Sequence, residues 1–270
     1  APSPCSPRGA RRGAGPHTIG RATLGLFDVA GRRVRLMTLS SLAVLPEADR
    51  LFNRPVAYEI SQFAPIARVL ADPTLLAVPA SAPWKTLKDF VEDARARPGQ
   101  IPYGSSGPYG TLHIAMEMFA ASAGIKLQHV PFRGAAPALT ALLGGTVQAL
   151  ASAPGVLKQQ VEDGKLRVLA NWGAERIASF PNLPTFRELG YKDVEFYIWA
   201  GLFAQSALPA PIMAQLRKAM ADAVKAPEVV KTFENAGSPV AYLDAPEFAK
   251  FVAGDSARLI AAVKKIGKVE

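Results

Sequence analysis

The chain has very little of the chemistry that cysteine and histidine supply. Its 270 residues include one cysteine, Cys5, and three histidines, His17, His113 and His129. A single cysteine excludes an intrachain disulfide and gives no indication of a redox compartment. The three histidines lack the spacing of a metal-ligand motif, so each is predicted to be a surface or loop residue.

Long hydrophobic runs are also missing. No segment approaches the ~18 consecutive apolar residues that a membrane-spanning helix needs. The sequence begins at Ala1 without an apolar signal core, so we expect that any export signal is absent or already removed. Hydrophobic residues make up 49% and charged residues 20% of the chain, which is typical of a globular protein. The length favours two domains over one.

Acidic residues are scarce in residues 1–35, which hold seven arginines and one aspartate. This segment therefore carries +6 of the formal net charge of +9, and the rest of the chain is nearly balanced. No basic patch with interleaved aromatic residues follows, so nucleic-acid binding is not predicted for the body of the protein. The breaker-rich composition of residues 1–35 predicts a poorly ordered arm, with phosphate binding as the alternative.

From residue 63 onward, short apolar strands alternate with amphipathic helices. This alternation predicts an α/β fold with parallel sheets. The expected strands are 23–27, 34–39, 63–69, 75–78, 101–104, 127–130, 147–151, 166–171 and 201–204. The expected helices are 81–95, 112–123 with Gly124 as its stop, 135–143, 156–162, 185–188, 211–225, 229–236 and one capped by Asp244.

The run from Ile101 to Gly145 contains one kind of junction twice. A strand enters a small-residue turn, and the turn opens directly into a helix. Such a junction directs backbone N–H groups and the positive end of a helix dipole at one point, which favours anion binding. The run offers no general base, metal ligand or activated nucleophile, so we expect capture of a ligand rather than catalysis.

Candidate ligand-binding residues follow from these junctions. The first junction contributes Ser105, Ser106, Gly107, Tyr109, Gly110 and Thr111. The alternative to ligand contact at this junction is an ordinary strand-to-helix turn in which Thr111 caps the helix. The second junction contributes Arg133, Gly134, Ala135 and Ala136, where Arg133 either pairs with a second carboxylate or is solvated. Ser152 follows the next strand and is expected at the same sheet edge.

Enzyme motifs are not found around these glycines and serines. The segment Gly104–Gly107 differs from the Gly-x-Ser-x-Gly nucleophile elbow, and no His–acid pair is placed to activate either serine. Gly104, Gly107 and Gly110 do not form the dinucleotide-binding fingerprint. The sequence therefore predicts no catalytic residue, no cofactor and no metal, and the chain is not expected to be an enzyme.

Several long motifs together resemble one known family. They are Tyr103-Gly-Ser-Ser-Gly107 with Thr111-Leu-His113, the run from His129 to Gly145, Gly164–Ala170, Phe180–Thr185 and Gly201–Ala204. From about residue 36 onward the chain resembles the solute-binding receptors of tripartite tricarboxylate transporters, the Bug-type periplasmic proteins. The resemblance implies a two-lobed, type II periplasmic-binding-protein-like fold. It also implies a hinge of two crossing strands, at 75–79 and 200–205.

The resemblance further implies an organisation and a function. Residues 81–199 would form one lobe, and residues 36–80 with 200–270 the other, which adds Thr38, Ser40 and Ser41 as candidate ligand residues. The lobes would close in the periplasm on a small organic carboxylate: a di- or tricarboxylate, an aromatic acid or an amino acid. The receptor would be a monomer that serves an integral membrane permease.

The first lobe departs from the family's pattern. Family members begin with a strand, a Pro- and Gly-rich loop and a helix, and that loop contributes much of the grip on the ligand carboxylate. Residues 1–35 stand in its place and do not match it. The alternative function is therefore a ligand-incompetent family member that acts as an interaction module.

Overall fold

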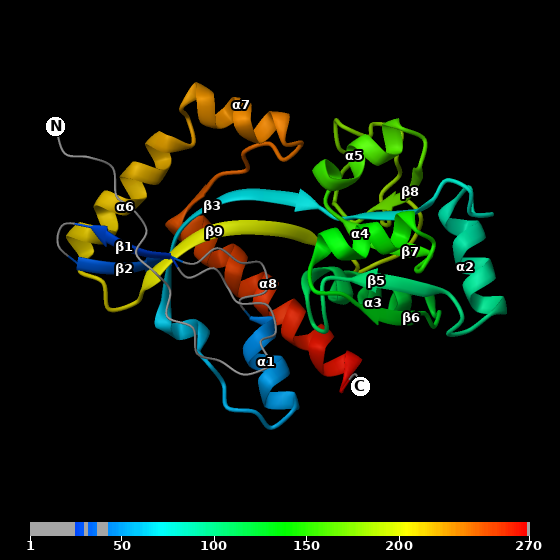
Figure 1. Cartoon of the computed structure of the whole chain (residues 1–270). Coiled ribbons are helices and arrows are strands. Elements are labelled where there is room, and N and C mark those ends of the chain that lie inside the picture. The colour runs from blue at the N-terminus through cyan, green and yellow to red at the C-terminus, as the bar shows by residue number, and fades with distance from the viewer. Residues whose placement is uncertain (1–24, 30–31, 37–42, 269–270) are drawn as a thin grey trace.

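Two long antiparallel strands, β3 (Phe63–Pro73) and β9 (Tyr197–Gln205), run from one half of the molecule toward the other (Figure 1). The computed structural model describes residues 25–29, 32–36 and 43–268. With β10 (Leu243–Asp244), these strands form a three-stranded sheet at one end. A five-stranded sheet forms the other end. The expectation of a two-lobed α/β fold is confirmed.

The five-stranded sheet is mixed rather than parallel. Its strands are β4 (Leu75–Pro79), β5 (Pro102–Ser105), β6 (Gln128–Pro131), β7 (Ala149–Ser152) and β8 (Leu166–Asn171). Their order is β6-β5-β7-β4-β8, with β5 parallel to β6 and β7, and β4 antiparallel to β7 and β8. The expectation of parallel sheets is wrong for β4, because β4 continues directly from β3 and not from a crossover helix. It is also wrong for the three-stranded sheet, in which both strand pairs are antiparallel.

Four helices connect these strands: α2 (Leu87–Ala96), α3 (Thr111–Ala123), α4 (Ala135–Leu143) and α5 (Pro154–Glu162). The expected helix start at Ser81 is wrong, because Thr86 and Asp89 form a reciprocal capping box that begins α2 at Leu87. The stop at Gly124 is confirmed by its left-handed φ of 63°. The helix expected at 185–188 is a series of turns.

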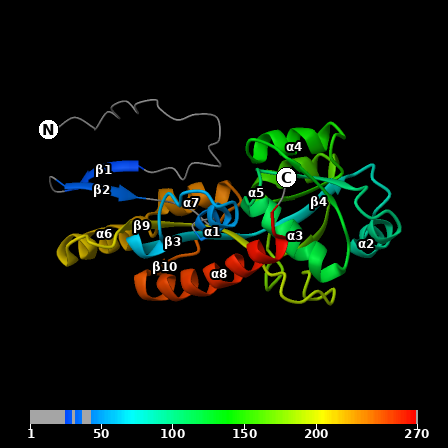
Figure 2. The same ribbon diagram turned by 90° about the horizontal axis from the view of Figure 1, so that it is seen from below.

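In the described residues, the three-stranded lobe carries four α-helices: α1 (Val44–Leu51), α6 (Ala210–Ala223), α7 (Pro227–Asn235) and α8 (Ala245–Ile266). The expected cap of α8 is confirmed, since the Asp244 carboxylate accepts the Ala245 N–H. α8 lies along β3 and extends to α3 of the other lobe (Figure 2). The sequence did not predict α1.

β1 (Gly25–Val29) and β2 (Arg32–Leu36) form a separate antiparallel ribbon (Figure 1). The ribbon overlaps the short strands expected at 23–27 and 34–39, and it lies almost entirely within the segment 1–35 that is expected to be a poorly ordered arm. No helix within the described ranges combines the length and the apolar character that spanning a membrane requires.

Backbone hydrogen bonds hold the crossing between the two sheets. Thr74 lies between β3 and β4 and donates its N–H to the Phe196 carbonyl at 3.3 Å. The Thr74 carbonyl accepts the Trp172 N–H at 2.9 Å, and Phe196 donates to the Trp172 carbonyl at 3.0 Å. The crossing therefore lies at Thr74, and residues 75–79 are an inner strand of the five-stranded sheet rather than a hinge strand. The predicted lobe limits stay a prediction.

Candidate functional site

The carboxyl ends of β5, β6 and β7 meet at one edge of the five-stranded sheet, which we call the strand-end edge. Ser105 of β5 pairs in register with Pro131 of β6, and the Phe132 N–H donates to the Ser105 carbonyl at 3.0 Å. β7, which ends at Ser152, lies on the other side of β5. The structure therefore brings the first junction, the second junction and Ser152 together.

Three helices begin at this edge without a side-chain cap. The N-cap residues of α3, α4 and α5 are Gly110, Gly134 and Ala153, and none of them offers a side-chain acceptor. Side chains cap α2 and α8, whereas α1, α6 and α7 also begin without a side-chain cap, so α3, α4 and α5 differ in that their N-termini share this one edge. The alternative in which Thr111 caps α3 is wrong, because Thr111 is already the first helical residue. Uncapped first-turn N–H groups are the donors that helix termini offer to anions.

In the turn of the first junction (residues 105–110), the Ser105 hydroxyl makes hydrogen bonds within the protein. Ser105 is fully buried, and its Oγ lies 2.6 Å from His129 Nε2 and accepts the Gly107 N–H at 3.1 Å. This hydroxyl therefore shapes the turn. Ser106 and Thr111 are only half-buried.

Strained backbone keeps the first turn compact. Gly107 has a φ of 127°, and Tyr109 has a φ of 54°, which is uncommon outside glycine. A Cβ on Gly110 would lie 2.8 Å from Ser106 Oγ. The Tyr109 hydroxyl donates to the Gly267 carbonyl at the end of α8 with a distance of 2.6 Å. The turn is thereby tied to a helix of the other lobe.

Two histidines lie stacked beneath this turn. The rings of His113 and His129 have centroids 4.0 Å apart and planes 18° apart, and Tyr103 stacks on His129 at 5.2 Å. The Tyr109 N–H donates to His113 Nδ1 at 2.9 Å. Because Nδ1 is the acceptor, the proton of the neutral His113 ring lies on Nε2, 4.0 Å from the carboxylate of Glu117.

Burial makes both of these rings poor proton acceptors. Desolvation, with a smaller contribution from His129, lowers the pKa of His113 to about 3. Desolvation also lowers the pKa of His129 to about 4. The prediction that these histidines are surface or loop residues is wrong, since His113 is fully buried on α3 and His129 is half-buried on β6. Both rings are neutral at pH 7 and serve as supports for the turn.

The second junction is more open than the first. Gly134 has a φ of 115° where the chain enters α4, a conformation that glycine adopts without strain. Arg133 and Ala136 are exposed, and Ala135 is half-buried. Ser152, at the end of β7, is buried. The three candidates from the first lobe lie outside the described residues: Thr38, Ser40 and Ser41.

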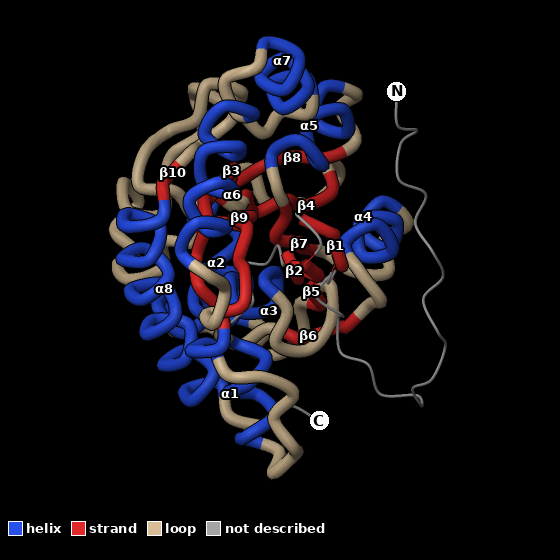
Figure 3. Tube along the Cα trace, turned by 90° about the vertical axis from the view of Figure 1, so that its left-hand side faces the viewer, coloured by secondary structure: helices blue, strands red, loops and turns tan. Residues whose placement is uncertain are grey.

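An additional contact between the lobes lies beside these turns. Gly155, in the first turn of α5, packs against the backbone of Ala236 and Gly237 at the end of α7. A Cβ on Gly155 would lie 2.1 Å from the Ala236 carbonyl oxygen. Figures 1 and 3 both show α5 and α7 as neighbours. No local sequence signal marks Gly155, because its requirement for glycine comes from a helix far along the chain.

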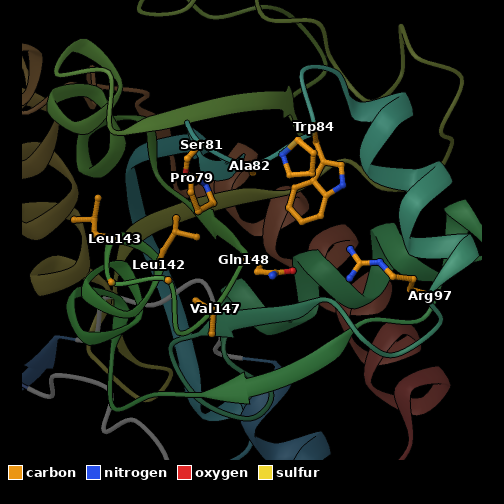
Figure 4. A pocket seen from close by; sticks show the side chains of 12 residues that line it. Pro79, Ser81, Ala82, Trp84, Arg97, Leu142, Leu143, Val147 and Gln148 are labelled. Carbon is orange, nitrogen blue, oxygen red and sulfur yellow. The ribbon is translucent and has the colours of Figure 1, made fainter.

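A cavity of about 510 Å³ lies at the opposite edge of the same sheet (Figure 4). It is lined by residues near the end of β4 and just before β7, together with Trp84 and Arg97 of the α2 region. The side chain of Gln148 points toward Arg97, and its Oε1 is buried with no hydrogen-bond partner among the described residues. The lining includes none of the predicted ligand residues, so this cavity is separate from the strand-end edge.

Comparison with known proteins identifies relatives over most of the chain. A protein in the gbd 5' region of Cupriavidus necator is 35% identical over 192 residues, which cover 71% of this chain and 58% of the relative. The chain thus spans less than two thirds of that relative's length.

Solved structures with the same fold cover more of the chain. A TctC solute-binding protein from Polaromonas, without ligand, superposes with a TM-score of 0.71 and 29% identity, over 86% of this chain and 77% of that one. The R. palustris protein Rpa4515, solved with adipate, superposes with a TM-score of 0.74 and is 26% identical in sequence. The match covers 86% of this chain and 76% of Rpa4515. The model of the tripartite tricarboxylate transporter family receptors matches residues 11–268. The chain therefore belongs to this family of solute-binding receptors.

Proposed function

We propose that this chain is a periplasmic receptor that captures a small organic carboxylate between its lobes for a tripartite tricarboxylate-type transporter. The observation that carries the proposal is that α3, α4 and α5 all begin at the strand-end edge without a side-chain cap. The ligand class is supported by Rpa4515, a relative of the same fold whose structure contains the dicarboxylate adipate.

In this proposal, backbone N–H groups and the two accessible hydroxyls of the first turn hold the guest without transforming it. Arg133 and the N–H groups of Ala135 and Ala136 bind the second carboxylate. Each charge-assisted hydrogen bond contributes roughly 1.5–3 kcal/mol, and several of them, less the ordering cost, give about micromolar affinity. Closure of the lobes then presents the loaded shape to an integral membrane permease.

Isothermal titration against a panel of carboxylates and their uncharged amides tests this proposal. We expect about micromolar binding of at least one carboxylate and no binding of its amide. Ala136→Asp places a negative charge in the exposed first turn of α4, where it favours the helix but repels an anion. We expect this variant to bind at least about tenfold more weakly, whereas the neutral isostere Ala136→Asn retains most of the affinity.

The alternative, a ligand-incompetent interaction module, makes the opposite prediction. A folded protein that binds no carboxylate of the panel would contradict the receptor proposal and favour the module. Limited proteolysis provides a second readout, since cleavage after the arginines of residues 1–35 reports whether this segment is protected. Protection that increases when a carboxylate is added supports the receptor.

A further inference from the structure

Asp72 is a buried carboxylate without a cationic partner among the described residues. It lies on β3, shortly before the crossing at Thr74, and is 5% exposed. Its one hydrogen-bond partner in this part of the chain is the Ser238 hydroxyl, which donates to Oδ2 at 2.5 Å. The carboxylate of Asp255, by contrast, is paired with Arg258 at 2.7 Å.

Asp72 is located next to the predicted anion donors. β4 begins at Leu75, which pairs in register with Ser152 at the strand-end edge. Ser238 directly follows Gly237, which touches Gly155 in the first turn of α5. Asp72 therefore lies where the two lobes meet, on the side of the strand-end edge at which α5 begins.

The surroundings of Asp72 leave its charge poorly compensated. Burial raises the pKa of this carboxyl, and the single bond from Ser238 opposes that effect only in part. A buried carboxylate is costly unless a cation pairs with it. A ligand that carries only carboxylates would add negative charge beside Asp72. A ligand with an ammonium group would supply the missing partner.

We propose that Asp72 binds the ammonium group of the ligand, so that the preferred guests are amino acids rather than unsubstituted carboxylates. The inference rests on the proposed function, because it assigns the chemistry of one more group in the same carboxylate site. It makes Asp72 the residue that determines specificity, while the uncapped helices determine that an anion binds.

Matched ligand pairs that differ only in the ammonium group test this assignment by titration calorimetry. The pairs are aspartate with succinate, glutamate with glutarate, and phenylalanine with 3-phenylpropionate. We expect the wild-type protein to bind the amino member of at least one pair about 10- to 100-fold more tightly. Asp72→Asn keeps the size of the side chain and an acceptor for Ser238. It should reduce this preference to about twofold or less and leave the unsubstituted acid bound as well as before or better.

Ser238→Ala is the matched control, because it removes the hydrogen bond to Asp72 but keeps the carboxylate. This variant should retain the preference for the amino member, and melting curves confirm that both variants fold. Equal affinities within every pair, or an Asp72→Asn effect that is the same on both members, would overturn the assignment and leave the proposed function intact. If the folded wild-type protein binds no member of any pair and no other carboxylate, the proposed function fails and the assignment fails with it.

Discussion

At the scale of single residues, two imidazole rings set the shape of the first turn from beneath. His113 accepts the Tyr109 N–H, and His129 lies within hydrogen-bond distance of the Ser105 hydroxyl. A protonated His113 has no free lone pair on Nδ1, so protonation and acceptance of the Tyr109 N–H exclude one another. The turn therefore depends on histidines that stay neutral, which burial favours.

Stability should consequently decrease as the pH falls from about 6.5 toward 4. The pKa of His129 is about 4 in the folded protein and lies near 6.5 in an unfolded chain, so the unfolded chain binds more protons in this window. Urea midpoints at pH 7 and pH 4.5 measure the loss. His129→Gln should lose less stability over this interval than the wild type, although it is less stable at pH 7. Equal losses in the two proteins would contradict the assignment.

Tertiary contacts explain why the sequence did not predict this histidine pair. His113 and His129 belong to α3 and β6, and they stack because β6 pairs with β5 beneath the start of α3. No local pattern encodes that contact. Asp72 was missed for the same reason, since its one partner in the described chain, Ser238, follows α7. The glycines of the turns were predictable, because a positive φ is a local requirement.

At the scale of elements, the structure agrees with the sequence pattern wherever local signals are strong. α4 and β8 have the predicted bounds, and Gly124 ends α3 as expected. The misplaced start of α2 shows that a capping box outweighs apolar periodicity in deciding where a helix begins. The direction of β4 could not be predicted from the alternation, because it depends on the crossing from a different sheet.

The contact between α5 and α7 gives a prediction at this scale. Gly155→Ala introduces a Cβ that would lie 2.1 Å from a backbone oxygen, and no rotamer change relieves such an overlap. We expect α5 and α7 to separate, the lobes to open and ligand affinity to decrease. Small-angle scattering and calorimetry measure these effects.

Gly254→Ala is the matched control for this substitution. Gly254 lies in α8 where a Cβ meets nothing within 4 Å. This variant should leave affinity and radius of gyration unchanged and stabilise the protein by roughly 0.5–1 kcal/mol, because alanine loses less backbone entropy than glycine. An unchanged affinity and radius of gyration for Gly155→Ala would show that the α5–α7 contact does not control the lobe arrangement.

At the scale of the whole molecule, the two lobes meet at a crossing that contains unpaired polar atoms. The hydroxyl of Thr74 and the indole Nε1 of Trp172 are buried there without hydrogen-bond partners among the described residues. Both residues take part in the backbone hydrogen bonds that connect β4, β8 and the start of β9. Leaving these two polar atoms unpaired lowers the stability of the folded protein. A receptor that moves its lobes about this crossing would retain this loss of stability, since a fully hydrogen-bonded and tightly packed crossing would favour one arrangement of the lobes.

The cost of the unpaired hydroxyl can be measured with a substitution of the same shape. Thr74→Val removes a buried, unsatisfied hydroxyl and should stabilise the protein by about 1 kcal/mol, or raise the melting temperature by roughly 2–4 °C. Because Thr74 links the two sheets, circular dichroism and tryptophan fluorescence should report the same single transition. Thr185→Val is the control of opposite sign, since the buried Thr185 hydroxyl accepts the Glu188 N–H at 3.0 Å. Thr185→Val is expected to destabilise the protein. If Thr74→Val destabilised it as well, the Thr74 hydroxyl would have a hydrogen-bond partner in solution, and the crossing would not lower the free energy of unfolding through an unpaired hydroxyl.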